Sequence, residues 1–124
     1  MTRRFQNFIN GRSILPNSSD WIDSVNPATG EVWAQIARGN VVDVRLAVES
    51  AKRASEQHDW RYNPTNRSKI LHDIADRLDR EHQKLIEIEI NDNGKRVREV
   101  KAQMSGLGDW YRHFAVATAQ MEVE

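Results

Sequence analysis

The sequence predicts an α+β fold in which short N-terminal strands and turns are followed by about four α-helices. Residues 1–39 carry turn dipeptides between short segments of alternating polarity, and residues 40–124 carry apolar side chains at helical spacing. We expect these 124 residues to form a single segment without internal repeats. Hydrophobic residues make up only 39% of the chain, which is lean for a self-sufficient core, so we expect the helices to pack against further protein.

Turn chemistry defines the strands of residues 1–39. Asn10-Gly11 lies between apolar residues and favours a type I′ hairpin, because both central positions of that turn need positive φ. Residues 21–25 are predicted to form a short strand, residues 26–30 (Asn-Pro-Ala-Thr-Gly) a turn, and residues 31–37 a strand with alternating faces.

Capping residues mark the first two predicted helices. Asn40 is expected to cap the first, with Asp43 at the favourable N3 position. The second is expected to begin at Asn63-Pro64, because proline at the first helical position loses no hydrogen bond. Their predicted buried faces are Val44, Ala47, Val48, Ala51 and Ala54, and Ile70, Leu71, Ile74, Ala75 and Leu78.

Two further helices complete the predicted fold. A shorter third helix carries Leu85, Ile86 and Ile90 and ends near Gly94, a residue suited to the positive φ of a helix C-terminus. A fourth, weakened near its centre by two glycines, is expected from about residue 97 to residue 121. Its predicted buried face is Val97, Val100, Met104, Leu107, Tyr111, Phe114 and Thr118.

Composition excludes several kinds of function. Lys plus Arg is 18 and Asp plus Glu is 18, so neither nucleic acid nor an anionic membrane is expected as a partner, and Arg3-Arg4 is expected to be a solvated tail. The 124 residues hold no cysteine and therefore no disulfide, thiolate metal site or thiol nucleophile. No apolar run reaches the roughly 18–20 residues of a membrane span, and no secretory signal is visible, so we expect a cytoplasmic protein.

No set of catalytic residues can be recognised from the sequence pattern alone. The four histidines are not spaced as metal ligands, and Asn93-Gly94-Lys95 lacks the other elements of a phosphate-binding loop. Neither a G-x-G-x-x-G motif nor a nucleophile elbow occurs. Residue-by-residue interpretation therefore indicates a mixed α+β segment whose chemistry is not visible.

Several stretches together resemble the N-terminal part of the aldehyde dehydrogenase superfamily, in the expected order and from about residue 5 to residue 117. Asn-Pro-Ala-Thr-Gly-Glu (residues 26–31) and Asp-Asn-Gly-Lys (residues 92–95) are specific as a pair at this separation. The other matching stretches are Phe8-Ile9-Asn10-Gly11, Asp43-Val44 with Ala47-Val48 and Ala51, Trp60, Arg67 to Leu78, and Trp110 to Ala115.

The resemblance implies an incomplete piece of a Rossmann-type aldehyde dehydrogenase subunit. That subunit oxidises an aldehyde to a carboxylic acid with NAD or NADP, through a cysteine nucleophile, a glutamate general base and a glycine-containing cofactor loop. All of these lie later in the family's chain, so no catalytic or cofactor-binding residue and no nicotinamide cofactor are expected in this segment. Residues 116–124 depart from the family pattern, which suggests a premature end.

The resemblance also implies two kinds of site within the segment. Ser24, Val25 and Asp92 match a monovalent-cation site for Na⁺ or K⁺, with backbone carbonyls or a hydroxyl from the first two and a carboxylate oxygen from Asp92. The alternative for Asp92 is a turn residue at the bend of residues 91–95. Gln103 and Leu107 match a wall of the substrate tunnel.

Two functions remain open at this point. The first is an N-terminal fragment of an aldehyde dehydrogenase, inactive alone, whose partner is the remainder of the subunit or a second copy of itself. The second is a stand-alone helical module that binds another protein through its apolar stripes.

Overall fold

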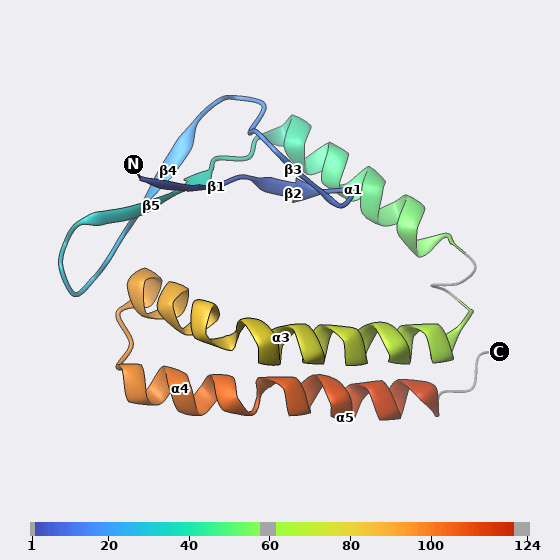
Figure 1. The fold of residues 1–124 in the computed structure, drawn as a ribbon. Helices are drawn as coiled ribbons and strands as arrows, with labels where there is room; N and C mark the ends of the chain where they lie inside the picture. The colour runs from blue at the N-terminus through green and yellow to red at the C-terminus, as the bar shows by residue number, and fades with distance from the viewer. Residues whose placement is uncertain (1, 58–61, 121–124) are drawn as a thin grey trace. The chain divides into compact units, whose positions relative to one another are not determined.

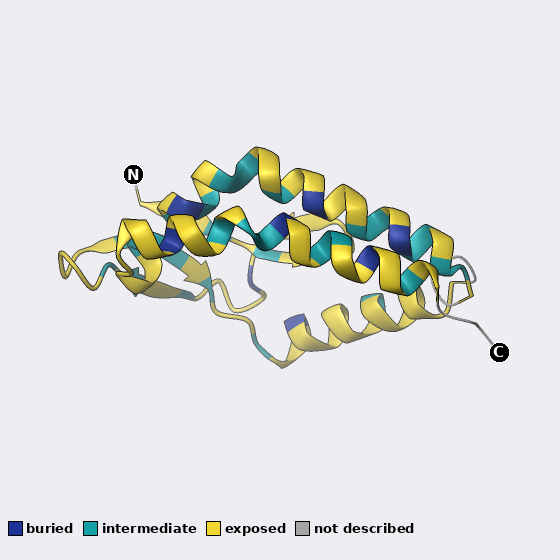
Figure 2. Cartoon of the chain, turned by 90° about the horizontal axis from the view of Figure 1, so that it is seen from below, coloured by how far each residue is buried: buried dark blue, intermediate teal, exposed yellow. Residues whose placement is uncertain are grey.

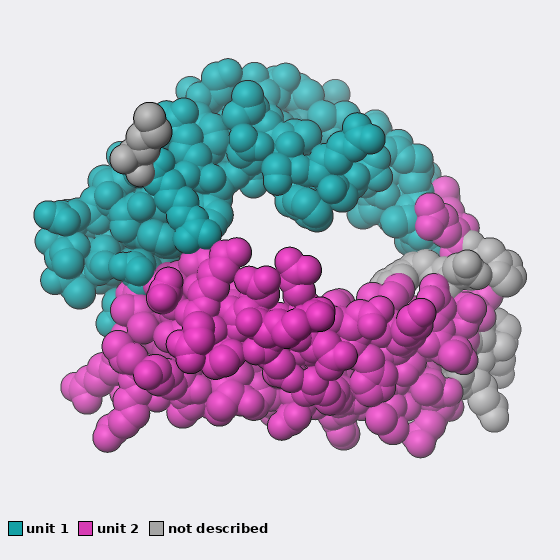
Figure 3. Space-filling view, in the orientation of Figure 1, with its two compact units in different colours: residues 1–55, 91–94 teal, residues 56–90, 95–124 magenta. Residues whose placement is uncertain are grey.

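The computed structural model describes residues 2–57 and 62–120, and these divide into two compact units. Unit 1 comprises residues 1–55 and 91–94, and unit 2 comprises residues 56–90 and 95–124 (Figure 3). Unit 1 contains the strands, the first helix and the end of the second. The aromatic residue Trp60, part of the family resemblance, lies outside the described residues.

A three-stranded mixed sheet forms the centre of unit 1. Its strand order is β1 (Arg3–Phe5), β5 (Val32–Ala37) and β4 (Trp21–Val25). β4 pairs antiparallel with β5, as consecutive strands joined by the turn of residues 26–30 should, whereas β1 pairs parallel with β5. The pair Arg3-Arg4 therefore lies in a strand, and the prediction of a solvated tail there was wrong.

The predicted hairpin is confirmed beside this sheet. β2 (Asn7–Ile9) pairs antiparallel with β3 (Arg12–Ile14), and the two residues between them have φ of 53° at Asn10 and 73° at Gly11. Both values lie in the left-handed region that a type I′ turn requires.

The first helix, α1 (Val41–Ser55), begins with a reciprocal cap and lies beside the hairpin (Figure 1). The Asn40 side-chain oxygen accepts the backbone N–H of Val42 at 2.9 Å, and the Asp43 carboxylate accepts the N–H of Asn40 at 2.9 Å. The cap was predicted, but the buried stripe was not correct. Val44 and Val48 are 58% and 60% exposed, and α1 is almost entirely exposed apart from Asp43 (Figure 2).

A single 30-residue helix, α3 (Pro64–Asn93), replaces the second and third predicted helices. Asn63 caps it, accepting the N–H of Asn66 at 2.9 Å, and Gly94 follows its end with φ of 69°, as predicted. The division into two helices was wrong because residues 79–84 (Asp-Arg-Glu-His-Gln-Lys) contain neither glycine nor proline, and a merely polar stretch does not end a helix. The polar stretch also forms ion pairs at helical spacing, such as Arg77–Glu81.

The predicted fourth helix is two helices, α4 (Val97–Ser105) and α5 (Leu107–Ala119), which follow one another along α3 in unit 2 (Figure 1). The break is at Gly106, whose φ of −100° and ψ of 0° interrupt the helical backbone. Glycine is the poorest helix former after proline, so it supplies the local weakness that the sequence had indicated.

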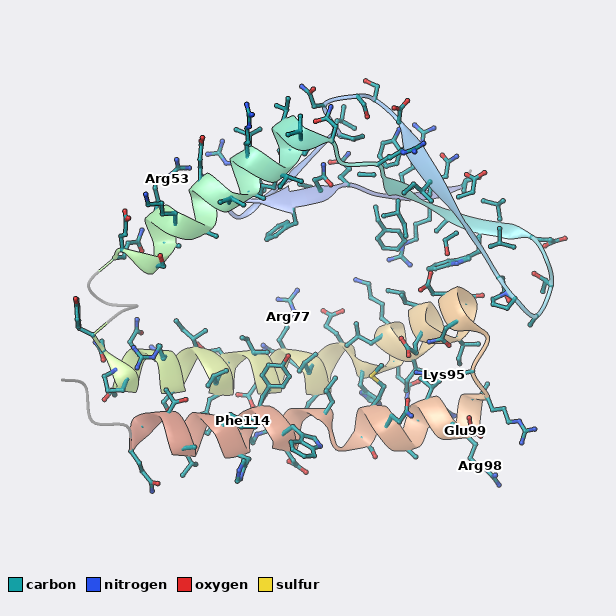
Figure 4. The ribbon with its side chains drawn as sticks, turned by 180° about the vertical axis from the view of Figure 1, so that it is seen from behind. Arg53, Arg77, Lys95, Arg98, Glu99 and Phe114 are labelled. Carbon is teal, nitrogen blue, oxygen red and sulfur yellow. The ribbon has the colours of Figure 1, made fainter. Side chains whose placement is uncertain are left out.

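The core of unit 2 lies where α3 faces these two helices. Ala75, Ile86, Val100 and Ala115 are at most 4% exposed. Phe114, predicted to be buried, is instead 54% exposed because the break at Gly106 ends the continuous periodicity on which that prediction relied. Phe114 is seen on α5 in Figure 4, and Lys95, Arg98 and Glu99 mark the start of α4 there.

Candidate functional site

Three side chains of unit 1 form a hydrogen-bonded chain at the edge of the sheet. The Trp33 indole Nε1–H donates to the Ser24 hydroxyl oxygen at 2.8 Å, and the Ser24 hydroxyl donates to the Asp92 carboxylate at 2.7 Å. Trp33 comes from β5, Ser24 from β4 and Asp92 from the last turn of α3. Two of the residues matched to a cation site, separated by 68 positions in sequence, are therefore in direct contact.

The backbone next to this contact is irregular. The β4–β5 register shifts between Ser24 and Val25: Ser24 pairs with Ala34 and Val25 with Val32, so Trp33 is the residue skipped in the ladder. A bulge leaves one residue without its ladder partner. A backbone carbonyl, a hydroxyl and a carboxylate are all oxygen donors of the kind that alkali cations take, so the donor types of Val25, Ser24 and Asp92 fit such an ion.

The turn of residues 26–30 lies against residues 91–94. The Asn26 side-chain amide donates to the Asn91 side-chain oxygen at 3.0 Å. A Cβ at Gly94 would stand 3.1 Å from the Pro27 Cβ, so glycine is needed there for close packing as well as for its positive φ. The Asn-Pro-Ala-Thr-Gly turn and the Asp-Asn-Gly-Lys stretch, which the sequence singled out separately, are thus two halves of one contact.

The two residues matched to the tunnel wall are not brought together by any contact in the described structure. Gln103 is exposed on α4, and Leu107 is the half-buried first residue of α5. In an unbroken helix they would be one turn apart on one face, but the break at Gly106 lies between them.

An ion-pair cluster that sequence reasoning missed lies in unit 2. The Arg112 guanidinium of α5 contacts the carboxylates of Asp79 at 2.6 Å, Asp76 at 2.8 Å and Asp109 at 3.4 Å. Hydrogen bonds to Asp79 and then to Asp76 raise the pKa of Arg112 above its ordinary value, so the guanidinium stays charged. The spacing of Asp76 and Asp79 on one helix face was the available signal, but it does not indicate which cation they face.

Another feature of unit 2 is an open hollow of about 530 Å³ on α5, lined by Gly106, Asp109, Trp110 and His113. Trp110 is 66% exposed and stacks on Phe114 with ring centroids 6.4 Å apart. Within residues 2–57 and 62–120, no three His, Asp or Glu side chains are grouped as metal ligands. No helix in the same ranges is long and apolar enough to cross a membrane.

Comparison with known proteins identifies the family. The aldehyde dehydrogenase family model matches residues 14–124. The chain belongs to the aldehyde dehydrogenase family.

Curated relatives of this family member share substantial identity with it. An aldehyde dehydrogenase of Deinococcus radiodurans is 40% identical over 115 residues, which cover 91% of the chain and 22% of that protein. A (Z)-2-((N-methylformamido)methylene)-5-hydroxybutyrolactone dehydrogenase of Acinetobacter baylyi is 31% identical over 121 residues, covering 97% of the chain and 24% of that protein. The chain therefore spans about a quarter of the length of the relatives it matches.

Solved structures of aldehyde dehydrogenases share this fold. An NAD-dependent aldehyde dehydrogenase from Sinorhizobium meliloti matches with a TM-score of 0.91 and 26% identity, over 100% of the chain and 25% of that structure. A betaine aldehyde dehydrogenase from Staphylococcus aureus, solved in complex with NAD⁺, matches with a TM-score of 0.88 and 26% identity, over 96% and 24%. The α+β arrangement predicted from sequence is thus a portion of the aldehyde dehydrogenase fold.

Proposed function

We propose that the chain serves as the N-terminal quarter of an NAD(P)-dependent aldehyde dehydrogenase subunit that oxidises an aldehyde to a carboxylic acid. The observation that carries the proposal is the packing of the Asn-Pro-Ala-Thr-Gly turn on residues 91–94, where Pro27 lies against Gly94 and so joins the two most specific family stretches. The relatives' names and the NAD⁺-bound neighbours support the reaction and the cofactor.

The proposed role within that subunit is structural. Thioester-forming aldehyde oxidation needs a thiolate nucleophile, and the 124 residues contain no cysteine. Catalytic and cofactor-binding groups would therefore come from the rest of the subunit. The 124-residue polypeptide by itself should show no aldehyde oxidation and no micromolar affinity for NAD⁺, which enzyme assay and isothermal titration calorimetry would test.

A segment exchange tests the main proposal. The matching segment of the Deinococcus radiodurans enzyme is replaced by residues 5–117 of this chain, and NADH formation with an aldehyde is measured. An active, folded chimera supports the proposal. The matched control carries the corresponding segment of the Acinetobacter baylyi protein. If that control is active while the chimera folds and is inactive, the chain does not serve as an aldehyde dehydrogenase N-terminus.

We further propose that Ser24, Val25 and Asp92 hold Na⁺ or K⁺ together with a carbonyl from the remainder of the subunit. The 2.7 Å contact between Ser24 and Asp92 supports this site, and Val25 follows Ser24 directly in β4. A bound ion would neutralise the one carboxylate in the donor set and tie the end of α3 to β4. Asp92 would be the only charged ligand, so Asp92→Ala should remove most of the affinity.

The salt dependence of the melting temperature tests the cation site. An ion that binds only the folded state stabilises it by roughly 2.7 kcal/mol at 100 times its dissociation constant. Joined to the remainder of the subunit, as one chain or as two co-expressed pieces, the wild-type segment should give a protein that melts higher in KCl or NaCl than in tetramethylammonium chloride at equal ionic strength, and Asp92→Ala should lose that difference. Equal ionic strength removes the contribution of general screening. If the wild type and Asp92→Ala show the same salt-specific shift in melting temperature, Asp92 is a turn residue and does not bind the cation.

The remaining parts of the proposal concern place and partners. We propose a cytoplasmic protein whose partner is the remainder of the subunit, with Gln103 and Leu107 on the substrate-tunnel side. The exposed stripe of α1 equally favours the rival function, a helical module that binds another protein. The segment exchange separates the two, because a stand-alone module has no reason to restore dehydrogenase activity.

A further inference from the structure

We infer that Trp33 is a positioning residue for the alkali-cation site, acting through the Ser24 hydroxyl on the Asp92 carboxylate. This inference rests on the proposed cation site and adds to it a residue that is not itself a ligand. The carrying observation is the linear chain of two hydrogen bonds, 2.8 Å from the Trp33 Nε1 to the Ser24 Oγ and 2.7 Å from there to the Asp92 Oδ1.

The chemistry of the three groups fixes the direction of this chain. An indole N–H can only donate, an ionised carboxylate can only accept, and a serine hydroxyl has one hydrogen and two acceptor positions. Trp33 therefore occupies one acceptor position of Ser24 and leaves the hydroxyl hydrogen to Asp92. Without the indole donor, the hydroxyl could rotate toward other acceptors and would hold the carboxylate less firmly.

Fixing Asp92 matters because this side chain is exposed at the end of a helix. An exposed carboxylate has several rotamers, and ordering it on ion binding costs conformational entropy. With Oδ1 already held by Ser24, the remaining carboxylate positions and the second acceptor position of Ser24 stay available to a cation. Such preorganisation strengthens binding mainly by lowering the cost of ordering the ligands.

Trp33 is itself well anchored. It lies in β5, its ring is half-buried, and it meets the Phe5 ring edge-on with centroids 5.9 Å apart. Replacing Trp33 by phenylalanine therefore keeps an aromatic ring against Phe5 and removes the N–H donor. Trp21 offers a matched control in β4, since its ring contacts the Arg4 guanidinium at 4.8 Å and no contact joins it to Ser24 among the interactions of the described residues.

The test follows the indole N–H resonances of the ¹⁵N-labelled chain, assembled with the unlabelled remainder of the subunit, during titration. KCl is exchanged for tetramethylammonium chloride at constant ionic strength, and the four tryptophans give separate indole probes. The Trp33 resonance should shift with K⁺, because an ion bound to Ser24 and Asp92 changes the electron density on the Ser24 oxygen that accepts the indole hydrogen bond. The Trp21 resonance should stay in place.

Variants separate positioning from a merely structural role. Trp33→Phe should raise the apparent K⁺ dissociation constant by roughly three- to tenfold, the effect of losing one ordering hydrogen bond. Trp21→Phe should leave it unchanged. A general loss of stability would lower melting temperatures in both salts equally, whereas loss of positioning shrinks the difference between KCl and tetramethylammonium chloride.

Two results would overturn the inference, and they are distinguishable. If no wild-type probe responds specifically to K⁺ or Na⁺, the cation site fails and the role of Trp33 fails with it. If the wild type responds and Asp92→Ala abolishes the response, but Trp33→Phe binds K⁺ as tightly as the wild type, the cation site stands and Trp33 does not position it.

Discussion

The Asp79 carboxylate of α3 occupies the space into which a side chain at Gly108 of α5 would project. A Cβ built on Gly108 collides with the Asp79 carboxylate and would lie 2.9 Å from the Arg112 Nη1. Gly108 is buried, and the Arg112–Asp79 ion pair lies across it at 2.6 Å. The absence of a side chain at residue 108 thus allows α3 and α5 to approach and their ion pair to form.

Gly108→Ala should destabilise the chain even though alanine is the better helix former. The propensity gain is about 1 kcal/mol, whereas forcing a methyl group into a packed contact costs roughly 1–3 kcal/mol. The steric cost is expected to win, because relief requires the Asp79 side chain to leave Arg112. Thermal unfolding by circular dichroism measures the change.

Gly106→Ala is the matched control for that substitution. Gly106 has negative φ, and nothing lies within 4 Å of its added Cβ, so alanine there should be neutral or slightly stabilising. If Gly108→Ala melts at or above the wild-type temperature, the close approach of Asp79 does not constrain the helices.

Arg112→Met should lower the melting temperature, more at low than at high ionic strength. Removing the guanidinium leaves the carboxylates of Asp76 and Asp79 without the cation between them, and their repulsion is screened by added salt because both are substantially exposed. Arg77→Met is the control, since Arg77 makes only an exposed 3.6 Å pair with Glu81 among the described ion pairs. Equal, salt-independent effects of the two substitutions would assign Arg112 no special role.

Local signals in the sequence were sufficient for most turns and caps. The Asn10-Gly11 hairpin, the Asn40 and Asn63 caps and the Gly94 terminus all depend on residues within a few positions of one another. The parallel pairing of β1 with β5 was not predictable in this way. It joins Phe5 to Ile36, and no pattern in three residues of a strand specifies so distant a partner.

The candidate site shows the same division between local and distant information. The family resemblance indicated Ser24 and Asp92, and the structure places them in contact. Trp33 gave no signal, because its role depends on a bulged register that brings its indole to Ser24. Burial on α1 was mispredicted for another reason: periodicity identifies an apolar face but cannot tell whether the partner that covers it lies within these 124 residues.

The exposed apolar stripe of α1 should make the isolated chain self-associate. Val44 and Val48 are mostly exposed, and Ala47 and Ala51 line a hollow of about 410 Å³ beside the hairpin. Exposed apolar patches promote association. Light scattering should show an apparent mass that rises with concentration, and Val48→Lys should reduce it. A concentration-independent monomer with a single cooperative melt would support the stand-alone module instead.

The Asp43 carboxylate should be the most sensitive polar position of unit 1. It is only 4% exposed and accepts the N–H of Asn17 at 3.1 and 3.2 Å and that of Asn40 at 2.9 Å, so it joins the loop after the hairpin to the start of α1.

Asp43→Asn keeps the shape of the side chain but turns one acceptor into a donor that faces N–H groups. We expect a loss of about 1–3 kcal/mol, the usual cost of leaving a buried donor unpaired. Asn40→Ser preserves a capping oxygen and loses only the exposed 3.1 Å hydrogen bond from the Asn40 amide to the Asn17 side-chain oxygen, so it should cost less, about 0.5 kcal/mol. Urea unfolding followed by tryptophan fluorescence compares the two, and a loss for Asp43→Asn no larger than that for Asn40→Ser would show that Asp43 is a simple capping residue.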